Sequence, residues 1–201
     1  MLPLLLLLTA IVQPGALIDR TLAIVGGEAV TLSDVHTALS LNLIESVDGD
    51  RVNSATERLV ERVLVLREVD RYAPPEPEDA LVDERVSQLR VRFATADQLA
   101  QALAAGGFSV ARVRAWLRDD LRIASYLNQR FAAVGPPTDE DARAFYGARR
   151  QEFERQQMTF EQAAPAIRQR LADDRRAQLI ADWVIDLRRR TAVIELWKIK
   201  S

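Results

Sequence analysis

The sequence predicts a mainly α-helical protein with a small β-sheet built from the two ends of the chain. Amphipathic helical patterns occupy most of residues 33–190. Two strand-like runs, TLAIV and EAVTL, flank Gly26-Gly27, a dipeptide that suits a two-residue hairpin turn. A third strand-like run, AVIEL, lies near the end of the chain, and its backbone groups need an extended partner. We therefore expect residues 192–196 to join the hairpin in one sheet.

Capping residues and turns set the expected boundaries of the first four helices. Ser, Thr and Asp side chains accept hydrogen bonds from the free N–H groups of a first turn, and glycine often follows a last turn. Ser33 is expected to cap the first helix, and Ser54 or Thr56 to start the second. The second helix carries apolar residues on more than one side, which indicates a central, buried element. The four helices are expected at about 34–45, 54–72, 78–93 and 97–105, the last closed by Gly106-Gly107.

A longer helix opened by Ser109 carries a continuous apolar stripe, which predicts its buried face. Trp116 lies at the rim of this stripe, and Tyr126 lies off it. The residues of the stripe are Val110, Val113, Leu117, Leu121, Ala124 and Phe131, widened by Ile123 and Leu127.

The next expected helix covers residues 139–153 and is capped by Thr138. Its first three residues, Asp139, Glu140 and Asp141, are acidic and favour the positive end of the helix dipole. A metal site is the weaker interpretation, because consecutive residues on a helix splay around it.

The last helix is expected to use two faces in succession. A capping box of Thr159 and Gln162 opens it, and Pro165 is expected to bend or restart it. Its apolar side chains then move from one side of the helix to another, which predicts contacts with two different partners. They are Ile167 and Leu171 in the first half, and Ile180, Trp183, Val184 and Leu187 in the second.

Composition limits the classes of function. The 201 residues are 48% hydrophobic and 28% charged, as in an ordinary globular protein, and one main body is expected. The 27 basic residues are interspersed with 29 acidic ones, so no basic face suits a nucleic acid. The absence of cysteine removes thiolate catalysis and disulfides. His36 is the single histidine and is expected at the surface, and the adjacent Asp119 and Asp120 are interpreted as solvated.

An apolar run from Leu2 to Val12 has the pattern of a secretory signal. It is too short to span a bilayer, which needs about 20 apolar residues. We expect residues 1–16 to be a cleaved export signal and the protein to be periplasmic. The alternatives are an uncleaved anchor and a buried helix. Of these expectations, only the uncleaved anchor would attach the protein to a membrane.

Several segments resemble the SurA-type periplasmic chaperones and parvulin-type foldases. IDRTLAIVGGEAVTLSDV is similar to the start of that family, and PTDEDARAFYGARRQEF to the segment that leads into its parvulin domain. The stretch from Thr159 to Leu196, including Trp183, is similar to the segment that leaves it. The resemblance implies a SurA/trigger-factor-like helical chaperone domain at 17–153. It also implies a C-terminal helix and strand at 154–201 that pack back on that domain.

One departure from the family determines the expected activity. Between Phe153 and Thr159 the family carries a parvulin isomerase domain, and this chain has only ERQQM. The resemblance therefore implies a non-enzymatic holdase without cofactors, which binds unfolded secreted or outer-membrane proteins in a groove between the helical body and the C-terminal helix. The alternatives are a structural or adaptor subunit with one fixed partner, and a remnant of a parvulin-type isomerase.

Aromatic side chains are the candidates for contact with unfolded clients, because large rings gain contact area at low entropic cost. Phe131 and Trp183 lie on apolar stripes and are assigned to the core. Four others are the expected client-binding residues: Trp116, Tyr126, Phe145 and Tyr146.

Overall fold

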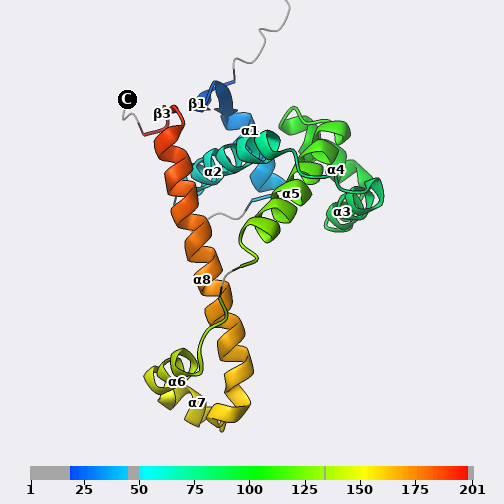
Figure 1. The fold of residues 1–201 in the computed structure, drawn as a ribbon. Coiled ribbons are helices and arrows are strands. Elements are labelled where there is room, and N and C mark those ends of the chain that lie inside the picture. The colour runs from blue at the N-terminus through cyan, green and yellow to red at the C-terminus, as the bar shows by residue number, and fades with distance from the viewer. Residues whose placement is uncertain (1–18, 45–49, 134, 199–201) are drawn as a thin grey trace, which may run out of the picture.

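The computed structural model describes residues 19–44, 50–133 and 135–198, so the expected export signal at 1–16 lies outside it. Over these residues the fold is mainly helical, with a three-stranded antiparallel sheet, as the sequence predicts (Figure 1). In chain order the elements are β1 (Thr21–Val25), β2 (Glu28–Thr31), α1 (Leu32–Ser40), α2 (Arg51–Tyr72), α3 (Asp79–Val91), α4 (Ala96–Ala105), α5 (Val110–Arg130), α6 (Asp139–Ala148), α7 (Arg150–Arg155), α8 (Phe160–Arg190) and β3 (Val193–Glu195).

The sheet joins the two ends of the chain in the order β2-β1-β3, which confirms the expected pairing of the C-terminal strand with the hairpin. Ile24 of β1 lies opposite Ala29 of β2 on one side and Ile194 of β3 on the other. The hairpin turns at Gly26 and Gly27, whose φ angles of 57° and 94° are in the region that glycine enters without strain. Residues more than 160 positions apart are thus paired by backbone bonds.

The main core lies under this sheet. α2 crosses it as the central helix, and its Leu59, Val60 and Leu64 are almost completely buried. The second half of α8 packs on the same cluster through Trp183 and Leu187, which are 8% and 1% exposed. Each such side chain contributes about 1.5–3 kcal/mol by leaving water. Trp183 is therefore a core residue, as expected.

Arg188 holds the end of α8 to two other elements. Its guanidinium pairs with Glu57 of α2 and with Glu195 of β3. Partial burial raises the pKa of Glu195, but its bonds with Lys198 and Arg188 outweigh this effect, so that pKa lies below its ordinary value. The carboxylate is therefore ionised at neutral pH, where it can hold the strand and the helix together.

A second core lies between α1, α3, α4 and α5. Leu41, just after α1, is completely buried there with Leu103 of α4 and Phe108. Arg118 of α5 fixes α3 from outside through Asp79, at 2.6 Å. The second core shares the partly buried Trp116 and Leu43 with the main core, so the two are continuous.

A third, separate core forms at the other end of α8. α6 and α7 pack on the first half of this helix, with Ala142, Ala163 and Ile167 buried between them. Figure 1 shows this lobe, which we call the distal lobe (residues 138–171), at the opposite end of α8 from the sheet. Arg168 and Arg175 of α8 reach Asp139 and Asp141 of α6 at 2.7 and 2.8 Å. The prediction that the last helix contacts two different partners is confirmed.

Two expected helix starts are wrong, and the reason is the same for both. Thr31, not Ser33, caps α1, because Thr31 and Asp34 form a capping box with each other. α2 begins at Arg51 under Asp50, and Thr56 lies inside it, where its hydroxyl donates to the carbonyl of Val52 at 2.7 Å. In both cases an earlier polar side chain accepts the capping bond, Thr31 from the N–H of Asp34 and Asp50 from the N–H of Asn53.

Three other expectations also need correction. α1 ends at Ser40 and not near residue 45, with Asn42 in a left-handed conformation at φ 49°. The expected helix 139–153 is divided at Arg149 into α6 and α7, which lets Phe153 stack on Tyr146. Pro165 does not restart α8, because the helix runs from Phe160 to Arg190 with this proline inside it.

The contact between α1 and α4 requires glycine at position 106. A Cβ atom there would lie 1.5 Å from Oγ1 and 2.7 Å from Cβ of the buried Thr37. We expect Gly106→Ala to lower the free energy of unfolding by about 2 kcal/mol or more, since overpacking of a core forces backbone shifts. The matched control is Gly147→Ala in α6, where no atom lies within 4 Å and the exchange should be neutral or stabilising. Urea denaturation measures both, and equal midpoints for the two variants would contradict this packing.

Candidate client-binding surfaces

The four aromatic residues expected to bind clients do not form one site. Trp116 and Tyr126 lie on α5 in the main body, and Phe145 and Tyr146 lie on α6 in the distal lobe. Figure 1 shows α5 within the main body and α6 in the distal lobe, at the end of α8 that is far from the sheet. If clients contact both groups, a single client segment has to extend along the length of α8.

Tyr126 is a core residue. This differs from the sequence prediction, in which it lies off the buried stripe of α5. It is 6% exposed, and its ring lies 5.5 Å from that of Tyr72 and 6.0 Å from that of Trp183. The stripe was derived for one buried face of α5, but α8 covers a second face of the same helix. The hydroxyl of Tyr126 accepts a long hydrogen bond from Arg130 at 3.4 Å.

Trp116 lies at a rim, as its place in the stripe predicts. The guanidinium of Arg62 stacks 3.9 Å above its ring, and also donates to the backbone carbonyl of Trp116 at 3.1 Å. Arg62 in turn donates to Asp120 at 3.0 Å, and Asp119 pairs with Arg122 at 3.3 Å. These two carboxylates brace α5 and are not simply solvated, as the sequence suggested. Burial raises the pKa of Asp120, and the charge of Arg62 opposes that rise.

Phe145 and Tyr146 occupy the distal lobe in different ways. Tyr146 stacks on Phe153 with ring centroids 4.8 Å apart, and its hydroxyl donates to the carbonyl of Met158 at 2.8 Å. Phe145 lines a pocket of about 240 Å³ under the guanidinium of Arg149. Both side chains are partly buried, and Tyr146 closes the lobe through its ring stack and its hydrogen bond.

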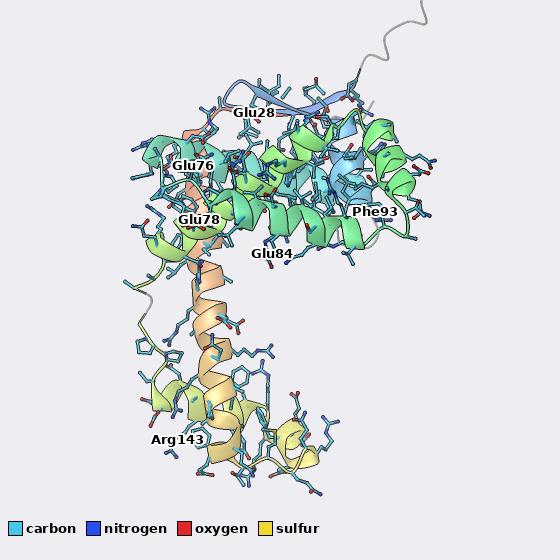
Figure 2. The ribbon with its side chains drawn as sticks, turned by 90° about the vertical axis from the view of Figure 1, so that its right-hand side faces the viewer. Glu28, Glu76, Glu78, Glu84, Phe93 and Arg143 are labelled. Atoms are coloured by element: carbon cyan, nitrogen blue, oxygen red, sulfur yellow. The ribbon has the colours of Figure 1, made fainter. Side chains whose placement is uncertain are left out.

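An apolar groove in the main body was not expected from the sequence. It has a volume of about 620 Å³ and lies between the end of α3, the helix α4 and the start of α5. Figure 2 labels Phe93 at this side of the body, away from Glu28 on the hairpin. The groove is lined mainly by small and apolar side chains: Phe93, Ala94, Ala96, Leu99, Ala100, Leu103, Ala104, Phe108 and Val110.

One signal could have indicated this groove. Val110 was assigned to the buried stripe of α5, but it is 51% exposed, and Val91 at the end of α3 is 84% exposed. A contiguous exposed apolar patch is a usual sign of a binding surface, and Val110 belongs to the lining of this groove. The sequence could not show which apolar residues stay uncovered, because that depends on where α4 crosses α5.

A second groove, of about 460 Å³, lies between α2 and the second half of α8. Its α8 side is apolar and includes Ile180 and the half-exposed Ile185, and its α2 side carries Glu57 and Glu61. This is the region between the helical body and the C-terminal helix where the sequence analysis expected clients.

Neither a metal cluster nor a membrane-spanning helix was found among the described residues. No three of their His, Cys, Asp or Glu side chains are grouped so that they could hold an ion. His36 is exposed on α1, as expected. None of the helices in these ranges combines the length and the apolarity that crossing a bilayer requires.

Comparison with known proteins supports the architecture. No family model matches the chain, and no curated protein matches it. A solved structure of a SurA-like chaperone from Campylobacter jejuni, from a study of the virulence factor PEB4 and the periplasmic protein Cj1289, matches with a TM-score of 0.53 at 12% identity. The match covers 88% of this chain and 99% of the other. At this identity the likeness establishes a SurA-like fold.

The position of Tyr126 leads to a stability prediction. We expect Tyr126→Ala to lower the free energy of unfolding by about 3–5 kcal/mol, as for other buried aromatics, and Tyr126→Phe to change it by less than about 1 kcal/mol. Urea denaturation followed by circular dichroism checks both variants. An unchanged midpoint for Tyr126→Ala would mean that the ring is at the surface and free to bind clients.

Proposed function

We propose that the protein is an exported, non-enzymatic chaperone that holds extended apolar segments of unfolded secreted or outer-membrane proteins. The observation that carries the proposal is the SurA-like fold, which leaves two apolar grooves open on one helical body. Grooves lined by aliphatic and aromatic side chains bind many sequences with modest affinity, because apolar contact is non-directional. Broad, weak binding is the behaviour that a holdase needs.

The connection between α7 and α8 supports a role without isomerisation. The resemblance to parvulin-type foldases places their catalytic domain at this point of the chain. Here Arg155 ends α7 and Thr159 caps α8, and the turn between them closes with Gln157 in a left-handed conformation at φ 55°. The proposed activity therefore depends on the grooves of the helical body and on no catalytic residue.

The proposed location and domain division follow from the same resemblance. Residues 1–16 are proposed to be a cleaved export signal that directs the protein to the periplasm. Residues 17–153 would form the chaperone domain, and 154–201 the segment that closes it. α6 and α7 pack on the first half of α8, so the distal lobe contains residues from both sides of this division.

An aggregation assay with a matched pair of variants tests the function. An unfolded outer-membrane protein is diluted from urea, and light scattering is recorded with increasing amounts of the chaperone. Ala100→Glu places a carboxylate in the groove between α3, α4 and α5, whereas Gln101→Glu adds the same charge to the next, exposed residue of α4 outside it. We expect Ala100→Glu to need about fivefold more protein for half-protection, since an ionised group in apolar contact costs a kilocalorie per mole or more.

The control Gln101→Glu should protect like the unmodified protein. Ala177→Glu applies the same test to the groove between α2 and α8. No protection by the unmodified protein at any ratio would contradict the chaperone proposal. A single stoichiometric partner, recovered from a periplasmic extract, would instead favour the adaptor alternative.

A further inference from the structure

Strand β2 has an open hydrogen-bonding edge. Gly26 donates to the carbonyl of Ala192, and Leu196 donates to the carbonyl of Leu22, so the even-numbered residues of β1 bond to β3. In an antiparallel ladder the bonding direction alternates from residue to residue. Ile24 therefore bonds to β3, and Ala29, which lies opposite it on β2, directs its N–H and C=O away from the sheet. Ala29 is exposed.

An apolar slot runs beside this edge. It has a volume of about 210 Å³ and lies between β2 and the first half of α5. Its apolar lining comes from Leu59, Val63 and Leu66 of α2 and from Ala115 and Trp116 of α5, and its charged lining includes Asp34, Arg62, Arg112 and Asp119. A free strand edge beside a cleft with apolar side chains fits an added extended chain. The slot shares no lining residue with the two larger grooves.

Glu28 is a charged side chain beside the slot that can pair with an incoming basic group. Arg112 is paired with Asp34 at 2.7 Å, and Arg62 is paired with Asp120. Within residues 19–44, 50–133 and 135–198, Glu28 has no ion pair, and Figure 2 shows it on the hairpin at the margin of the body. An incoming basic side chain beside Glu28 would form a cross-strand pair of opposite charge.

We infer that β2 is a docking edge for an extended polypeptide segment with an apolar and a basic side chain two positions apart. The middle residue of the segment exchanges backbone bonds with Ala29 and points outward. Its two neighbours point to the slot, because side chains alternate along a strand. One, beside Val30, is apolar and enters the slot over Leu66 and Trp116, and the other, beside Glu28, is basic. This inference rests on the proposed function. It adds a site that binds a client through hydrogen bonds to its backbone.

The backbone requirement provides the sharpest test. Ala29→Pro removes the outward N–H but leaves the bonds between β1 and β2, and proline is tolerated on an outer strand edge. The matched control is Val193→Pro, which removes an outward N–H on the opposite edge of the same sheet. The probe is the blocked peptide acetyl-Ser-Leu-Thr-Lys-Ser-amide. Binding is followed by the NMR shift of the Trp116 indole in every variant, and also by that of the Ala29 amide in proteins that keep this N–H.

We expect Ala29→Pro to weaken peptide binding about fivefold, which corresponds to one hydrogen bond of about 1 kcal/mol, and Val193→Pro to leave it unchanged. A peptide with an N-methyl group on its threonine removes the reciprocal bond, from the threonine N–H to the carbonyl of Ala29. It is used on the unmodified protein, so this test does not depend on the folding of a variant. Glu28→Gln should weaken the binding of this peptide. It should not change the binding of a peptide that has glutamine in place of lysine.

The outcomes separate this inference from the proposed function. Equal binding of the normal and N-methylated peptides would overturn the docking edge, and protection in the aggregation assay would then leave the chaperone role intact. Loss of binding on N-methylation, together with no protection from aggregation, would support the edge and contradict the chaperone role. Dimerisation of the unmodified protein that Ala29→Pro abolishes would show that a second copy occupies the edge, and would overturn the inference.

Discussion

The pairing of β3 with β1 is the constraint on which the rest of the structure depends. It joins residues 192–197 to the strand that starts the described chain, and so fixes the end of α8 beside α2. Closing so long a loop costs little more entropy than closing a short one, because the cost grows with the logarithm of length. Arg188 strengthens the closure, since it pairs with Glu57 of α2 and Glu195 of β3 at once.

With its C-terminal end fixed, α8 can support a second body at its other end. Its first half carries Ile167 into the distal lobe, and its second half carries Trp183 and Leu187 into the main core. The exposed stretch at 173–175 lies between these two faces. The helix thus separates the distal lobe from the main body, and no residue of the distal lobe lines the grooves beside α4 and α8. A body that leaves apolar surface open is suited to hold chains that have not folded.

The sequence was sufficient for the architecture but not for the site. Strand pairing, the Gly26-Gly27 turn and the two faces of α8 were predictable, because each follows from a local pattern or from the need of backbone groups for partners. Tyr126 was misplaced because a helical wheel shows one buried face, and α5 has two. The α3–α4–α5 groove and the β2 edge were missed, since exposure depends on how neighbouring elements cross.

Removal of residues 191–201 tests the central claim most directly. We expect a cooperative loss of at least about 3 kcal/mol in the free energy of unfolding, because several backbone bonds and the pairing of Arg188 with Glu195 are lost together. Hydrogen exchange at the amide of Ile24 should become fast, whereas Val25, which bonds to β2, should stay protected. An unchanged urea midpoint with a protected Ile24 amide would show that the two ends of the chain do not hold the fold together.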